Sequence, residues 1–170
     1  MAIRHIRLFP DPVLSRPCCP ALMNYNNLTT LVQDLRDTLY ASPGVGLAAP
    51  QIGIAQQVCV LDISRKKSSH KKHIENTGDF LILINPKLIE GKGWQVPREG
   101  CLSVPDLLAN VKRFQYVKVK TLTPDRQERV IEAEGFGALA LQHEIDHLSG
   151  ILFLDRVVNI KTDIFRRKNY

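Results

Sequence analysis

Two histidines four residues apart, with a glutamate directly after the first, carry the clearest chemical signal in the chain. They stand in the stretch His143-Glu144-Ile145-Asp146-His147, which matches the pattern H-E-x-x-H. On a helix, side chains four residues apart lie on one face, so both imidazoles can bind a single divalent ion. Glu144 then projects beside the ion, where it can take a proton from metal-bound water. The pattern predicts a metal-dependent hydrolase.

The helix that carries this pair is expected from about Gly137 to Ser149. Apolar residues on most of its sides predict that it lies at the centre of the fold. A first amphipathic helix is expected over 26–41, where leucines and a valine recur at helical spacing. Short apolar or alternating runs predict strands at 57–63, 80–84, 116–120 and 129–133. Together they predict an α+β fold of mostly antiparallel strands around a central metal-binding helix.

Length and composition bound the class of protein. With 170 residues, 44% of them hydrophobic, the chain is expected to form a single domain over 1–170. No run of about 18 apolar residues is present, so we expect a cytoplasmic protein that does not enter a membrane. Much of the net charge of +6 comes from a basic loop insertion at 64–79 and a basic C-terminal tail at 159–170. The loop is either a solvated insertion or a contact with RNA.

Two histidines need at least one further protein ligand, and the downstream sequence does not supply it. Phe153 fills the place where some zinc peptidases have a third histidine, and no glutamate follows Glu144. Asp155 and Asp163 match no known ligand spacing. Upstream, Cys101 lies in a turn-prone setting that could present a thiolate to the helix. Taken alone it would more often be a buried structural residue, but beside the histidine pair we favour it as the third ligand.

A segment of small residues from Gly44 to Gln51 is the third notable stretch. Small residues let a backbone approach a ligand closely, as where an extended peptide pairs with the edge of a strand. By itself the segment would also be consistent with a glycine turn. The Gln51 amide is a candidate donor to a carbonyl oxygen on which charge develops.

These three stretches, in this order, resemble the hallmarks of the bacterial-type peptide deformylases. The motifs are G-x-G-L-A-A-x-Q at 44–51, E-G-C-L-S at 99–103 and Q-H-E-x-D-H-L-x-G at 142–150. The resemblance runs over nearly the whole length and implies removal of the N-formyl group from formyl-methionine of nascent polypeptides, with release of formate. It departs at 106–110, where the family commonly has a glycine or a polar or basic residue, and at 64–79, where the loop is longer than usual.

The resemblance also implies roles for individual residues. Cys101, His143 and His147 would bind the metal, with a water as the fourth ligand and Glu144 as general acid and base. The Gln51 amide and the Leu102 backbone N–H would hold the formyl oxygen. The expected substrate contacts are Gly44, Val45, Gly46, Leu102, Leu139 and Ala140, and the expected supporting ion pair is Arg113 with Asp146; without the resemblance, those two charges could be unrelated surface groups.

The family's usual metal is Fe(2+), with Ni, Co or Zn able to substitute, and a ferrous site beside a thiolate implies sensitivity to oxygen. We expect a monomer, with ribosome contact through the basic loop or the C-terminal tail as a further implication. Two rival functions remain at this stage. A zinc endopeptidase would need a downstream ligand, and a structural metal site in an RNA-binding module would be closed by a fourth protein ligand.

Overall fold

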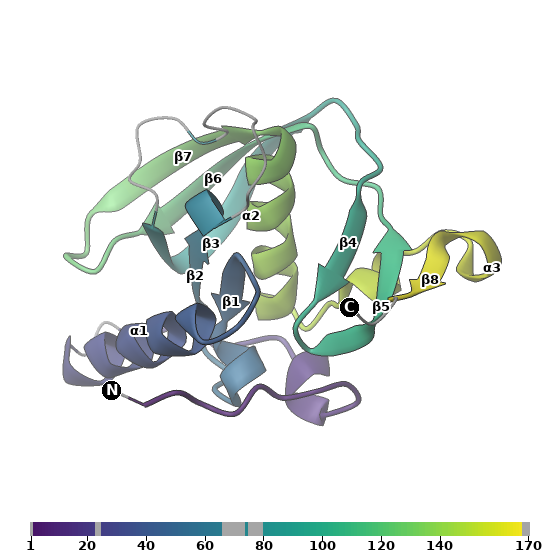
Figure 1. Cartoon of the computed structure of the whole chain (residues 1–170). Coiled ribbons are helices and arrows are strands. Elements are labelled where there is room, and N and C mark those ends of the chain that lie inside the picture. Colours follow the sequence, from purple (N-terminus) through teal and green to yellow (C-terminus); the bar gives the residue numbers. More distant parts are fainter. Residues whose placement is uncertain (1, 23–24, 66–73, 75–79, 168–170) are drawn as a thin grey trace.

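Two antiparallel sheets flank one central helix in the computed structural model, which describes residues 2–22, 25–65, 74 and 80–167 (Figure 1). The central helix, α2, spans Gly135–Leu148. On one side stands a five-stranded sheet of order β1-β2-β3-β6-β7, and on the other a three-stranded sheet of order β4-β5-β8. The predicted α+β class, with antiparallel strands around the helix that carries H-E-x-x-H, is confirmed.

The larger sheet is covered by a helix on each face. Its strands are β1 (Gly46–Ala48), β2 (Val58–Asp62), β3 (Phe80–Lys92), β6 (Tyr116–Leu122) and β7 (Glu128–Glu134). Because side chains alternate along a strand, Val58 and Val60 pack with the leucines of α1 (Tyr25–Tyr40), while Cys59 and Leu61 pack with α2. The continuous apolar run of β2 is therefore explained by burial on both faces.

The smaller sheet consists of β4 (Arg98–Cys101), β5 (Val104–Asn110) and β8 (Ile164–Arg166). A third apolar cluster, which includes Leu14, Cys101 and Phe153, packs beneath it. Residues expected only as a basic tail form the short helix α3 (Ile160–Asp163) and then β8, which pairs with β5. The C-terminal segment thereby completes the sheet that holds Cys101.

Several strands extend beyond the expected ranges or were not expected. β3 continues from the predicted 80–84 to Lys92, although Asn85 and Pro86 interrupt the apolar run. Asn85 has a φ of 50°, and the register with β6 shifts between Ile84 and Lys87, so a local irregularity accommodates the proline. The strands β1, β4, β5 and β8 are short or contain glycine or proline, which is why local propensity did not indicate them.

Four one-turn 3₁₀ helices complete the described chain: Pro12–Ser15, Ala49–Ile52, Ile63–Arg65 and Phe153–Arg156. Within the described ranges, no helix is both long and apolar enough to cross a membrane. Most of the basic loop predicted at 64–79 lies outside the described residues.

Candidate metal centre and substrate pocket

Three potential ligands from two elements converge beside the central helix. His143 and His147 project from one face of α2, with their ring centroids 5.0 Å apart. Cys101 ends β4, and its Sγ lies 3.2 Å from Nε2 of His147. One ligand atom from each of the three residues lies within 4.8 Å of the other two. The structure therefore brings the three sequence-predicted ligands together.

The chemistry of this cluster fits a divalent metal ion. Burial would raise the pKa of the Cys101 thiol, but His147 and His143 together lower that pKa well below its ordinary value. The backbone N–H of Ser103 also donates to Cys101 Sγ at 3.4 Å. A thiolate with two imidazoles suits ions of borderline softness, and three protein ligands leave a position open for water or substrate.

The downstream residues that were considered for the third ligand position have other contacts. Asp155 accepts a hydrogen bond from the Leu152 backbone N–H at 2.8 Å. Asp163 accepts from the Asn159 backbone N–H at 3.3 Å, in the exposed turn before β8. Phe153 stacks on His143 with the ring centroids 6.3 Å apart. The geometry thus agrees with the upstream cysteine rather than with a downstream ligand.

A buried chain of charges stands behind the histidines. Glu99 accepts from His143 Nδ1 at 2.8 Å and from Arg113 through Nε and Nη2 at 2.7 and 3.0 Å. Arg113 also donates to Asp146 at 2.5 Å, and Arg156 donates twice to the same carboxylate. Despite the opposing effect of burial, His143 and Arg113 hold the pKa of Glu99 below its ordinary value. The network orients the His143 ring with Nε2 free for the centre.

The structure therefore brings Arg113 and Asp146 together, as the resemblance implied, and adds two partners that sequence reasoning missed. Arg156 lies ten residues after Asp146 in a 3₁₀ helix, and no local pattern indicates its contact. For Glu99 a signal existed: it stands two residues before Cys101, so on a strand both side chains share one face. Recognising that signal required knowing that 98–101 is a strand.

Glu144 is buried at 4% exposure and lines one pocket together with Cys101 and His143. Its Oε2 has no hydrogen-bond partner among the described residues. Burial is the main cause that raises the pKa of Glu144, to about 7, while His143 and His147 oppose it. A Cβ on Gly46 would overlap the Glu144 carboxylate, so glycine at that position lets Glu144 keep its place beside β1.

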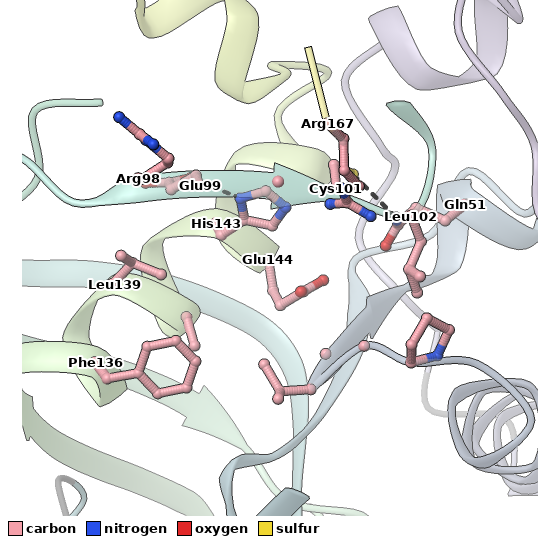
Figure 2. A pocket seen from close by; sticks show the side chains of 16 residues that line it. Gln51, Arg98, Glu99, Cys101, Leu102, Phe136, Leu139, His143, Glu144 and Arg167 are labelled. Atoms are coloured by element: carbon pink, nitrogen blue, oxygen red, sulfur yellow. Dashed lines mark hydrogen bonds and ion pairs between the residues drawn. The ribbon is translucent and has the colours of Figure 1, made fainter. Parts of the chain in front are cut away.

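Gln51 is held in the wall of the same site by its short 3₁₀ helix. Its Oε1 accepts from the Ala48 backbone N–H at 2.9 Å, which turns Nε2 toward Cys101 Sγ at 3.5 Å and Ser103 Oγ at 3.1 Å. Leu102 follows Cys101, and its side chain fills the space that a Cβ on Gly44 would need. Gln51 and Leu102 therefore flank the cluster on the side opposite Phe136 (Figure 2).

A pocket of about 260 Å³ is lined by Cys101, His143 and Glu144 (Figure 2). On one side Phe136, Leu139 and Ala140 of α2 form an apolar wall together with Val45. Phe136 was not among the residues expected from the sequence. Residues of β1 and β4 line the pocket, and each of these is an end strand of its sheet. The pocket is therefore bordered by two strand edges. The remaining lining residues are Pro43, Gly44, Gly46, Gln51, Arg98, Glu99, Gly100, Leu102 and Arg167.

Comparisons with known proteins agree with this geometry. The family model for polypeptide deformylase matches residues 3–163. The peptide deformylase of Heliobacterium modesticaldum is 45% identical over 161 residues, which is 94% of this chain and 97% of that protein. The crystal structure of a peptide deformylase from Legionella pneumophila superimposes with a TM-score of 0.83 at 38% identity, covering 94% and 89% of the two chains.

A Met-Ala-Ser-bound crystal structure of a class I type b peptide deformylase from Acinetobacter baumannii has a TM-score of 0.81 and 30% identity. The match covers 92% of this chain and 99% of the Acinetobacter chain. Because the matches in sequence and in structure both extend over nearly the whole length, the chain belongs to the polypeptide deformylase family, whose members are hydrolases that remove the N-formyl group from nascent peptides.

Proposed function

We propose that Glu144, Gln51 and the backbone of Leu102 perform the family's reaction here, on the formyl-methionine that begins nascent polypeptides. The observation that carries this assignment is the position of Glu144. Its buried carboxylate has an oxygen without a partner in the described structure, and Glu144 lines the same pocket as Cys101 and His143 of the three-residue cluster. A buried polar group without a partner is costly, and it is therefore expected where a substrate or water completes its contacts.

Cys101, His143 and His147 would hold one divalent ion, and we propose ferrous iron rather than nickel, cobalt or zinc. When bound, such an ion polarises the formyl carbonyl and lowers the pKa of a water molecule. The donor set supports an ion of borderline softness and is compatible with all four metals, so the choice of iron rests on the resemblance to the family. Glu99 positions His143 through the hydrogen bond to Nδ1.

Glu144 then moves the protons of the reaction. Its carboxylate accepts a proton from the attacking water and delivers one to the nitrogen of the methionine that leaves. Gln51 Nε2 and the Leu102 N–H donate hydrogen bonds to the formyl oxygen as negative charge develops on it. The contact between Gln51 Oε1 and Ala48 fixes the amide in advance, so little reorganisation is needed during the reaction.

An extended substrate fits between the two strand edges that border the pocket. Gly44 and Gly46 on one side and Gly100 on the other line the pocket, and we propose that the peptide backbone lies along these glycines. The methionine side chain would lie against Val45, Leu102, Leu139 and Ala140, where an unbranched thioether packs well on an apolar wall. The Acinetobacter relative that was crystallised with Met-Ala-Ser supports the class of ligand.

We further propose that the protein acts as a cytoplasmic monomer and meets its substrates at the ribosome. The nature of the substrate, a nascent chain, supports this location, as do the basic residues of 159–170 and 64–79. The segment 159–170 includes β8, in which Arg166 is exposed. Co-sedimentation with ribosomes at low and high salt tests the contact, because a contact made by basic residues should weaken as salt increases.

Cys101→Ser tests the site as a whole. We expect the variant to fold but to retain little metal after gel filtration, and to release little formate from formyl-Met-Ala-Ser. Ser103→Ala is the matched control, because Ser103 stands two residues after Cys101 and accepts a hydrogen bond from Gln51. This variant should keep its metal. Full metal content and full formate release in Cys101→Ser would contradict the proposed ligand set.

A further inference from the structure

Two arginines from distant parts of the chain border the pocket away from its apolar wall. Arg98 is the first residue of β4, and Arg167 directly follows β8. Both line the pocket that contains Cys101, His143 and Glu144 (Figure 2). The last described residue of the chain thus reaches a site built by segments far from it in sequence.

Local packing places both guanidinium groups on one face of β4. Arg98 and Gly100 are two residues apart, so they face opposite to Glu99 and Cys101. A Cβ on Gly100 would overlap the Arg167 guanidinium, which lies across the strand because glycine leaves that space open. The Arg98 guanidinium stacks 4.0 Å above the centroid of Phe165 in β8. The β5–β8 pairing, continued by the bond from Arg167 N to Asp106 O at 2.8 Å, holds this arrangement.

The charges of these two arginines are not neutralised by carboxylates of the described structure. Neither guanidinium forms an ion pair there, in contrast to Arg113 and Arg156. Of the two acids that line the pocket, Glu99 is already bound by Arg113 and His143, and Glu144 is buried. Asp106 is exposed on β5, and its printed contact with Arg167 is through the main chain. This side of the pocket therefore has an excess of positive charge.

We propose that Arg98 and Arg167 form a subsite for carboxylate side chains in the second or third residue of the formylated peptide. The inference rests on the proposed function, because it requires the peptide to leave the metal cluster along β4. An extended chain advances about 3.3 Å per residue, the same as the strand beside it. Arg98 lies three residues from Cys101, and Gly100, beside which the Arg167 guanidinium lies, is one residue from it. The two arginines are therefore expected to lie beside the residues that follow methionine in the peptide.

The test compares kcat/KM for C-terminally amidated peptides, which lack a terminal carboxylate. The substrates are formyl-Met-Ala-Ala, formyl-Met-Glu-Ala, formyl-Met-Lys-Ala and formyl-Met-Ala-Glu, with the metal-loaded enzyme. We expect at least one glutamate peptide to exceed the alanine peptide by about fivefold, mainly through KM, and the lysine peptide to fall below it. The preference should shrink when NaCl rises from about 0.05 to about 0.5 M.

Arg98→Gln combined with Arg167→Gln should reduce the glutamate preference to within about twofold. Arg166→Gln is the matched control, because Arg166 is the residue before Arg167, is exposed and does not line the pocket. This control should keep the preference of the unaltered chain.

Three results would overturn the proposal, and they are distinguishable. Equal processing of the glutamate and lysine peptides, with good turnover of the alanine peptide, would refute the subsite and leave the proposed function standing. Faster turnover of every peptide by Arg167→Gln would show that this side chain obstructs the pocket instead of binding an acid. Failure to process any formyl peptide would contradict the proposed function and the subsite together.

Discussion

Arg113 joins two buried carboxylates, and its removal should strongly lower the free energy of unfolding. The side chains of Arg113, Glu99 and Asp146 are 2%, 1% and 9% exposed. Arg113→Met keeps most of the side-chain length but leaves Glu99 with His143 alone and Asp146 with Arg156 alone. Breaking a buried ion pair by removing one partner costs about 3–5 kcal/mol. Because each carboxylate keeps one partner, we expect the lower end of that range, about 3 kcal/mol.

Urea unfolding of the metal-free protein measures this cost without a contribution from metal binding. Lys87→Met, an exposed lysine in β3, is the control and should change the free energy of unfolding by less than about 0.5 kcal/mol. Adding Glu99→Gln to Arg113→Met removes one of the two buried carboxylates that have lost a partner, and should restore about 1 kcal/mol of the free energy of unfolding. A loss below about 1 kcal/mol for Arg113→Met alone would refute the claim that the network is a desolvated unit.

Three further changes probe the pocket. Glu99→Gln weakens the acceptor for His143 Nδ1 and should lower metal affinity by about 10- to 100-fold, measured by competition with a chromophoric chelator; unchanged affinity would argue against a positioning role. Gly46→Ala places a methyl group against the Glu144 carboxylate and should reduce kcat by about tenfold or more with metal content retained, so full kcat would contradict the close approach of β1. Leu139→Ala enlarges the apolar wall and should raise KM for formyl-Met-Ala-Ser by several-fold; a changed kcat at constant KM would place the methionine elsewhere.

The central helix and its two histidines were predictable because their information is local. The four-residue spacing of His143 and His147 fixes a shared face once the segment is helical, and the apolar residues around them indicate burial. Cys101 could be inferred only by exclusion of downstream residues, and the order of three motifs made that inference specific. The fold class followed from the same helix and from four predicted strands, of which the one at 129–133 alternates less cleanly.

The smaller sheet could not be predicted because its strands depend on partners distant in sequence. Gly100 and Pro105 favour a turn locally, yet pairing of β4 with β5, and of β5 with β8, makes the segment extended. The contact of Arg167 with Gly100 joins residues 67 positions apart and has no local signature. The ion pair of Glu99 with Arg113 could not be predicted for the same reason, since Arg113 follows β5 and lies 14 residues away in the chain.

The most direct test of the account is formate release by Glu144→Gln, purified anaerobically and loaded with Fe(II) beside the unaltered protein. Both proteins should bind one metal per chain, because Cys101, His143 and His147 are intact in each. We predict that the variant loses about 10²–10⁴-fold in kcat for formyl-Met-Ala-Ser, the usual contribution of a general acid and base. Near-normal turnover by a fully metal-loaded Glu144→Gln protein would contradict the assignment of proton transfer to Glu144.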